Sequence, residues 1–180
     1  MIDAAPSSRS QADTREQCEL AWDVLRGVND PEVPVVSVVD LGIVRAVDVV
    51  EAGGLVVTVT PTYSGCPATE VIEANIRSAL DAAGLGPTQI RIARAPAWTS
   101  DWISAEGRAK LRAYGIAPPG PVDRDAAVPL RFFARAPAPL ACPRCASTNT
   151  ERLAAFGATA CKALWRCRAC GEPFEHFKPI

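Results

Sequence analysis

Two short cysteine motifs near the end of the chain, Cys142-Pro143-Arg144-Cys145 and Cys167-Arg168-Ala169-Cys170, decide the fold of its last forty residues. Each C-x-x-C turn directs two thiolates at one ion, and two such turns complete the tetrahedron of a closed structural zinc site. Twenty-one residues separate the motifs, which leaves room for two short strands and a turn. We therefore predict a zinc ribbon over residues 139–180, with these four cysteines as the metal ligands.

Four alternatives stay open within this ribbon. Cys161 lies between the two motifs, so it either replaces one of the four ligands or is a fifth thiol near the metal. His176 would have to displace a cysteine to become a ligand, and we predict an exposed polar side chain instead. A tetrahedral set of four sulfurs serves zinc and iron alike, and we favour zinc. Disulfides are the alternative in an oxidising compartment.

Composition and charge limit the classes of function. The chain has 180 residues, 48% of them hydrophobic, enough for one domain and a small appendage. Residues 1–15 do not resemble a signal peptide, and no apolar run approaches the ~18 residues of a membrane span, so we expect a cytoplasmic protein. Residues 139–180 carry six basic and three acidic residues. Four thiolates around Zn²⁺ would add two negative charges, which argues against nucleic-acid binding.

The first part of the chain alternates helical and strand patterns. We expect a helix over 14–27, strands over 43–50 and 55–60 joined as a hairpin, a helix from 67 to 84, a strand over 89–94 and a helix over 104–114. The fold class is therefore α+β, with helices packed on a three-stranded mixed sheet and a zinc ribbon after it. The predicted domain limits are a disordered tail over 1–13, a domain over 14–115, a Pro-rich connector over 116–138, of which only residues 130–133 are expected to pack, and the ribbon over 139–180.

Two groups of residues in the first domain could carry chemistry. Cys66 precedes Pro67, a residue suited to the first position of a helix, and unpaired N–H groups at a helix start favour a thiolate. Asp30, Glu32 and Asp40 form an acidic group, although each could simply cap a turn or strand start. A cysteine hydrolase would need a histidine partner, and the one histidine of the chain lies in the ribbon. Cys66 could equally be inert.

Three segments of the first domain resemble a known family. Asp30-Pro31-Glu32-Val33-Pro34, Val39-Asp40-Leu41-Gly42-Ile43-Val44 and the stretch from Thr60 to Pro67 are similar to the SufT-like domain of iron–sulfur assembly proteins, over about residues 15–115. The ribbon segment from Phe156 to Leu164, taken with Cys167, Cys170 and the residues around Phe174, resembles the PaaD family. That family comprises the D components of the phenylacetyl-CoA epoxidase (ring epoxidase) system.

The resemblance implies an accessory factor of this multicomponent oxygenase in aerobic phenylacetate degradation. It would promote iron or iron–sulfur loading of the epoxidase complex, with Cys66, Asp40, Asp30 and Glu32 handling transient iron or a cluster. Its partners would be the epoxidase subunits or their reductase and other iron–sulfur assembly proteins, and a homodimer stays open. The chain lacks the E-x-x-H helices of a di-iron subunit and any nucleotide fingerprint, so we do not expect it to be the catalytic subunit or the reductase. The competing class is a non-catalytic structural subunit, and an electron-transfer protein is a weaker third.

Overall fold

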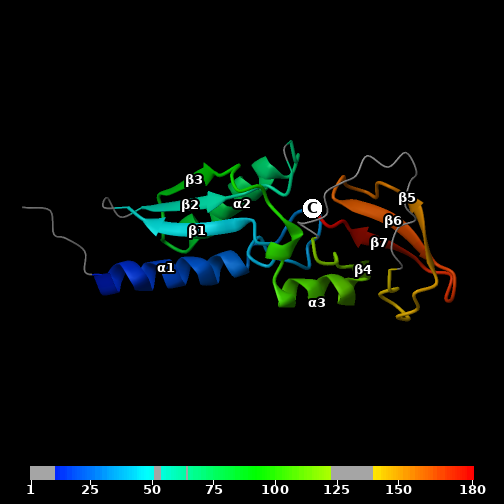
Figure 1. Ribbon diagram of the computed structural model, residues 1–180. Helices are drawn as coiled ribbons and strands as arrows, with labels where there is room; N and C mark the ends of the chain where they lie inside the picture. Colours follow the sequence, from blue (N-terminus) through cyan, green and yellow to red (C-terminus); the bar gives the residue numbers. More distant parts are fainter. Residues whose placement is uncertain (1–10, 51–53, 64, 123–139) are drawn as a thin grey trace, which may run out of the picture. The chain divides into compact units, whose positions relative to one another are not determined.

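The computed structural model describes residues 11–50, 54–63, 65–122 and 140–180, and the chain forms two compact units that divide after Pro96 (Figure 1). The predicted tail up to residue 10, most of the predicted hairpin turn and the segment 130–133 lie outside the described residues. Within the described part of the chain, no helix combines the length and apolar character needed to cross a membrane.

The first unit is a three-stranded sheet with two long helices. In chain order it contains α1 (Gln11–Arg26), β1 (Val44–Val49), β2 (Leu55–Val59), α2 (Thr69–Ala82) and β3 (Thr88–Ile92). The strand order is β1-β2-β3, with β1 and β2 antiparallel and β2 and β3 parallel. Parallel neighbours need a crossover connection, and α2 provides it. The predicted mixed sheet of three strands is confirmed.

The core of the first unit follows from the periodicity of its elements. In α2, Ile72, Ile76 and Leu80 are spaced four residues apart, and all three are buried. These residues form one stripe because side chains four positions apart share a helix face. The central strand β2 is buried along nearly its whole length, as expected for a strand with a neighbour on each side.

The second unit contains a four-stranded sheet. Its elements are the 3₁₀ helix η1 (Ser100–Trp102), α3 (Ala105–Tyr114), β4 (Ile116–Ala117), β5 (Thr150–Ala154), β6 (Lys162–Cys167) and β7 (Pro173–Phe177). The strand order is β4-β7-β6-β5, in which β4 is parallel to β7 and the other pairs are antiparallel. The two strands predicted between the cysteine motifs are β5 and β6.

The second unit extends further toward the N-terminus than the cysteine motifs suggest. The sequence pattern placed the helix over 104–114 in the first domain and residues 116–117 in the connector, whereas in the structure both belong to the second unit. Ile116 pairs with Glu175 and Ala117 with His176. This pairing joins residues almost sixty positions apart, and no local pattern in the sequence reveals it.

Arg108 on α3 fixes the loops around this helix. Its guanidinium donates to the carbonyl oxygens of Ser100 at 2.7 Å, Ile103 at 3.3 Å and Pro119 at 2.6 Å. Ser100 in turn exchanges two hydrogen bonds with Ile180, donating from its amide at 3.1 Å and accepting at its hydroxyl at 3.2 Å. The planar, five-donor guanidinium suits this role because one side chain can satisfy several buried carbonyls.

Candidate functional site

The four cysteines of the two C-x-x-C motifs form a group of metal-binding geometry. The sulfur atoms of Cys142 and Cys170 lie 3.9 Å apart, those of Cys145 and Cys167 lie 3.5 Å apart, and all four lie within 4.8 Å of one another. A tetrahedral Zn²⁺ with Zn–S bonds of about 2.3 Å places its sulfurs about 3.8 Å apart. The donor set therefore fits a structural zinc ion, and the described part of the chain holds no other group of three or more Cys, His, Asp or Glu side chains this close together.

The two turns that carry these ligands have the same backbone hydrogen bonding. In each turn, the backbone amide of the first cysteine donates to the carbonyl oxygen of the residue five positions later in the chain. The backbone amide of the residue four positions later donates to the carbonyl oxygen of that first cysteine. All four of these hydrogen bonds, two at Cys142 and two at Cys167, measure 2.9 Å. The fourth residue after each first cysteine has a positive φ, 60° at Ala146 and 80° at Gly171. Glycine adopts this left-handed conformation without strain, whereas alanine does not.

Backbone N–H groups and neighbouring thiols set the protonation of the ligands. The backbone N–H of Cys170, with that of Ala169, lowers the pKa of Cys167 to about 7. The backbone N–H of Ser147 acts to lower the pKa of Cys145, but hydrogen bonding to Cys167 and to the other sulfurs raises it to about 12. The four sulfurs therefore cannot all ionise near neutral pH without a cation, because the charges repel one another. A bound metal ion would take the place of the shared protons.

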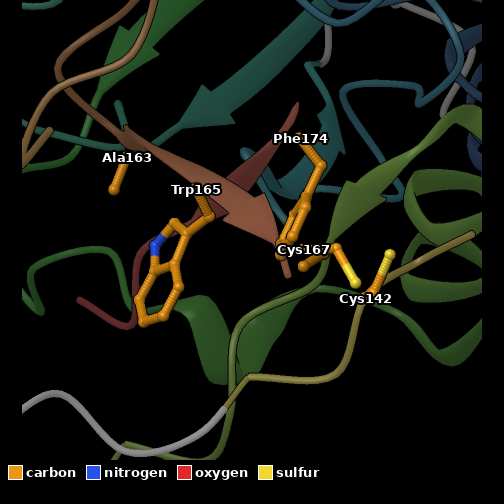
Figure 2. Close-up of a cluster of buried hydrophobic side chains, with 6 residues drawn as sticks. Cys142, Ala163, Trp165, Cys167 and Phe174 are labelled. Carbon is orange, nitrogen blue, oxygen red and sulfur yellow. The ribbon is translucent and has the colours of Figure 1, made fainter. Parts of the chain in front are cut away.

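A small apolar core supports one side of this group (Figure 2). The buried cluster consists of Ala117, Cys142, Ala163, Trp165, Cys167 and Phe174, with Leu140 packed against it. Figure 2 shows the sulfurs of Cys142 and Cys167 beside each other, next to the Phe174 ring. Cys145 and Cys170 are exposed. The metal site therefore joins the ribbon core to the surface, so metal binding and packing of the core stabilise each other.

Sequence reasoning did not single out Trp165 and Phe174 as part of this site. They are opposite each other on β6 and β7, and both lie on the face that carries Cys167. A signal was present, because Ala163, Trp165 and Cys167 alternate along β6 with Lys162, Leu164 and Arg166, two of which are charged. Period-two alternation places them on one face of a strand.

Cys161 is not part of the metal group. It is buried, and its sulfur lies 3.0 Å from the hydroxyl oxygen of Thr159. The close group of four sulfurs consists of the paired cysteines, as the spacing of the motifs predicts, and does not include Cys161.

His176 differs from the expectation of an exposed polar residue. It is half-buried, and its ring meets that of Trp165 edge to face at a centroid distance of 6.0 Å. Burial, with a smaller effect from Lys178, lowers the pKa of His176 to about 4. Its Nε2 atom is buried and has no hydrogen-bond partner among the described residues. The prediction was wrong because the side chain shares a face of the ribbon sheet with Trp165, one strand away.

Cys66 lies in a turn that leads into α2. The helix begins at Thr69 with Ala68 as its N-cap, two residues later than the start predicted at Pro67. The amide of Cys66 donates to the carbonyl of Tyr63 at 3.3 Å, and its own carbonyl accepts from the amide of Thr69 at 3.2 Å. Cys66 is half-buried. Pro67 and Ala68 therefore form a tight turn between the cysteine and the helix rather than its first residues.

The carboxylates of Asp30 and Asp40 cap the turns in which they lie. Asp30 is 7% exposed, and its Oδ1 accepts from the amides of Glu32 at 2.9 Å and Val33 at 2.8 Å. Asp40 Oδ2 accepts from the amide of Ser37 at 3.0 Å, and the Ser37 hydroxyl accepts from the amide of Asp40 at 3.0 Å. Glu32 is half-buried. These hydrogen bonds are those of the capping role that the sequence left open.

The structure does not gather the predicted residues of the first unit into a metal site. Among the described residues, Cys66, Asp30, Glu32 and Asp40 do not form a set of three or more ligand atoms within 4.8 Å of one another, as the four cysteines do. The two predicted sites thus differ in kind: one is an assembled group of ligands, and the other is a single thiol together with acids that cap turns of their own.

Comparison with known proteins also separates the part of the chain that contains Cys66 from the part that contains the four ribbon cysteines. Residues 19–92 match the family model described as "Iron-sulfur cluster assembly protein", and residues 129–178 match the "PaaD zinc beta ribbon domain". A crystal structure of a domain of unknown function DUF59 from Bacillus anthracis is similar in fold, with a TM-score of 0.53 and 24% identity, covering 57% of this chain and 97% of that one.

Two curated relatives carry the comparison further. An Fe–S protein maturation auxiliary factor of Porphyromonas gingivalis is 37% identical over 49% of this chain and 84% of its own length. A protein assigned as the D component of 1,2-phenylacetyl-CoA epoxidase in Escherichia coli (strain K12) is 46% identical over 88% of this chain and 91% of its own length. The chain therefore belongs to the PaaD family of phenylacetyl-CoA epoxidase D components, with an iron–sulfur cluster assembly domain followed by a zinc ribbon.

Proposed function

We propose that this protein is a cytoplasmic accessory factor that promotes the loading of iron or an iron–sulfur cluster into the phenylacetyl-CoA epoxidase system during aerobic phenylacetate degradation. One observation carries the proposal: a single chain joins a domain similar to Fe–S protein maturation factors to a ribbon of the epoxidase family. Its partners are the epoxidase subunits or their reductase, together with other iron–sulfur assembly proteins.

In this proposal, Cys66 is the residue that handles the iron or cluster as cargo. A thiolate is a soft ligand for iron, and one thiolate releases its metal by ligand exchange far more readily than four thiolates do. The half-buried position of Cys66 in a short turn supports this role, because the turn holds the thiol without enclosing it. Asp30 and Asp40 position the neighbouring turn through their caps, and Glu32 supplies a carboxylate for a transient contact with iron.

The ribbon has a different task in this proposal. Cys142, Cys145, Cys167 and Cys170 would hold a structural Zn²⁺, which supplies a crosslink rather than a reactive centre. The apolar cluster around Trp165 excludes water from the inner two ligands. The ribbon is therefore a stable module that the assembly domain carries with it, suited to recognising the client protein.

A non-catalytic structural subunit of the epoxidase is the second candidate. One observation favours it: the carboxylates of Asp30 and Asp40 accept backbone hydrogen bonds and so act as turn caps. In that case Cys66 is inert and the whole chain serves to hold the complex together.

Client loading with a cysteine variant separates the two candidates. The epoxidase subunits and their reductase are coexpressed with wild type, with Cys66→Ser or with the control Cys18→Ser. Cys18 is also half-buried in the first unit, and its thiol donates to the carbonyl oxygen of Val47 at 3.5 Å. Iron and acid-labile sulfide are then measured in the purified clients.

We expect Cys66→Ser to lower the iron or sulfide content of the clients while its melting temperature matches that of wild type. Cys18→Ser should load the clients normally. Equal loading with all three proteins would support the structural subunit instead.

A further inference from the structure

The loop between β5 and β6 can be followed in Figure 1. It carries the most exposed large apolar side chain of the described residues. Phe156 is 66% exposed, and Leu153, three residues earlier, is 48% exposed. Leu153 lies at the irregularity between Arg152 and Ala154 in the β5–β6 pairing, and an extra residue there turns its side chain outward. One exposed apolar side chain is common on protein surfaces, so the exposure of Phe156 matters only together with the features of its loop.

Hydrogen bonds hold this loop in one conformation. The amide of Gly157 donates to the carbonyl of Lys162 at 2.8 Å, and the amide of Ala158 donates to Glu175 Oε1 at 3.0 Å. The other oxygen of Glu175 lies 2.7 Å from the ammonium of Lys162, whose side chain is only 5% exposed. A Cβ atom on Gly157 would come within 2.6 Å of Glu175 Oε1, so a larger residue there would displace the carboxylate of this ion pair.

Lys178 ties the loop to the strand at the end of the chain. Its amide donates to the carbonyl of Cys161 at 2.9 Å, and its ammonium donates to the carbonyl of Ala155 at 3.3 Å. The same ammonium lies 4.3 Å from the centroid of the Phe156 ring. A cation over an aromatic face favours one position of the ring. The Phe156 ring is therefore held in solvent by a loop that is itself well ordered.

A rigid, exposed aromatic ring is an effective binding anchor. An aromatic side chain buries a large area on binding, and a loop already in its bound conformation loses little entropy there. Such residues dominate the binding energy of many protein interfaces. Folding alone does not explain this arrangement, because the ring contributes little to the core of the ribbon.

The charges around Phe156 indicate the character of its partner. Within the ribbon, Glu151 already pairs with Arg166 and Arg168, and Glu175 pairs with Lys162. Arg152, four residues before Phe156, and Lys178, beside its ring, have no carboxylate partner among the described residues, so two uncompensated positive charges accompany Phe156. Complementary charge steers association and disfavours the wrong partners.

We propose that Phe156 anchors the ribbon to the client protein by entering an apolar pocket that is bordered by carboxylates. This inference rests on the proposed function, since it names the surface by which the assembly factor recognises its client. Phe156 fills the pocket, Leu153 covers one margin of it, and Arg152 and Lys178 meet the acidic border.

Binding of purified clients to the full-length, zinc-loaded protein tests this surface. Each epoxidase subunit and the reductase is titrated in its metal-free form against wild type, Phe156→Ala, Arg152→Glu and the control Tyr114→Ala by isothermal calorimetry. Tyr114 is a suitable control because it is an aromatic residue of the same unit, is 56% exposed and lies on α3. Zinc content and melting temperature are measured for every variant.

We expect Phe156→Ala to weaken binding of one client about tenfold or more, with zinc content and melting temperature unchanged. Arg152→Glu should weaken the same binding most strongly at low salt, and Tyr114→Ala should bind as wild type does. Unchanged binding by Phe156→Ala overturns the inference. It is also overturned if light scattering shows that Phe156→Ala dissociates a homodimer while client binding persists.

The Cys66→Ser variant distinguishes a failure of this inference from a failure of the proposed function. If Cys66→Ser binds the client like wild type but does not load it, docking and loading are separate steps and both proposals stand. If Cys66→Ser loads the client normally while Phe156→Ala loses binding, the docking surface stands and the maturation role falls.

Discussion

The two cysteine-bearing regions of this protein differ in how completely the fold assembles them. The four thiols of the ribbon lie within 4.8 Å of one another and rest on an apolar core. Cys66 lies in a short turn, and the acids predicted to accompany it cap turns of their own. An assembled set of four ligands holds a metal permanently, whereas one thiolate suits a metal in transit. In the proposed function, this difference separates a structural site from an exchange site within one chain.

The largest expected effect is the loss of a buried ribbon ligand. Cys167→Ser should remove about one zinc per chain and unfold the ribbon, because structural zinc contributes on the order of 10 kcal/mol to the folding of small zinc domains. Chelation of the wild-type protein should do the same while the first unit stays folded. Metal analysis and two-dimensional NMR spectra of the full-length protein measure both effects.

The matched control for this experiment is Cys161→Ser, which should keep the zinc because Cys161 lies outside the group of four sulfurs. A full complement of iron with no more than trace zinc in freshly purified wild type would contradict the assignment of the ribbon as a zinc site.

A smaller effect is expected at Asp40 in the first unit. Asp40→Ala removes the acceptor for the amide of Ser37, and losing a cap of this kind costs about 1 kcal/mol. If Asp40 acts only as a cap, denaturant unfolding should show this loss and the clients should still be loaded with iron. Asp40→Asn keeps an acceptor oxygen and should be nearly as stable as wild type. A loading defect in Asp40→Asn without a loss of stability would assign Asp40 to the exchange site and reduce the contrast between the two regions.

The next prediction concerns the strain in the first ribbon turn. Ala146 has φ 60° where the second turn has glycine, so Ala146→Gly should stabilise the zinc-bound ribbon by about 0.5–1 kcal/mol. Thermal melting of the zinc-loaded protein measures this gain. The reverse change in the second turn, Gly171→Ala, should destabilise by a similar amount. A loss of stability in Ala146→Gly would mean that the flexibility glycine adds to the unfolded chain outweighs the relief of strain.

The smallest effect at neutral pH is expected at His176, since at pH 7 its imidazole is neutral in the folded chain and mostly neutral in the unfolded chain. Burial lowers its pKa from an ordinary value of 6.5 to about 4. The unfolded chain therefore takes up a proton first as the pH falls, and stability is lost progressively between pH 6.5 and pH 4. His176→Phe removes this contribution, so its melting temperature should fall less than that of wild type between pH 7 and pH 5. Any loss of zinc at low pH affects both proteins equally. Parallel curves of melting temperature against pH for the two proteins would contradict the prediction.

Several features could be predicted from sequence because their signals are local. The hairpin of β1 and β2 follows from two Val-rich runs around a Gly-containing turn, and the buried stripe of α2 follows from the spacing of Ile72, Ile76 and Leu80. The ribbon ligands follow from two motifs of four residues each. In every case, the residues that form the feature are close together in the chain, so their spacing alone determines which side chains meet.

Other features were missed, one of them local and two dependent on distant contacts. The start of α2 at Thr69 instead of Pro67 reflects an extra turn that Cys66 closes through its carbonyl. The half-buried position of His176 depends on Trp165 in the neighbouring strand, and the place of Ile116 depends on pairing with Glu175. Neither partner can be identified from the residues next to it in the sequence.

The sequence by itself determined the two cysteine motifs that favour the ribbon ligands, the strands of the first unit and the resemblance to iron–sulfur assembly domains, because each is encoded in short-range spacing. Only the tertiary structure decided that Cys161 lies outside the metal group, that Asp30 and Asp40 cap turns, and that the loop at Phe156 is held by Lys178 and an ion pair. These outcomes depend on which strands and loops become neighbours. The free energy that selects those neighbours comes from burial and hydrogen bonding across the whole unit, which no single segment of the chain contains.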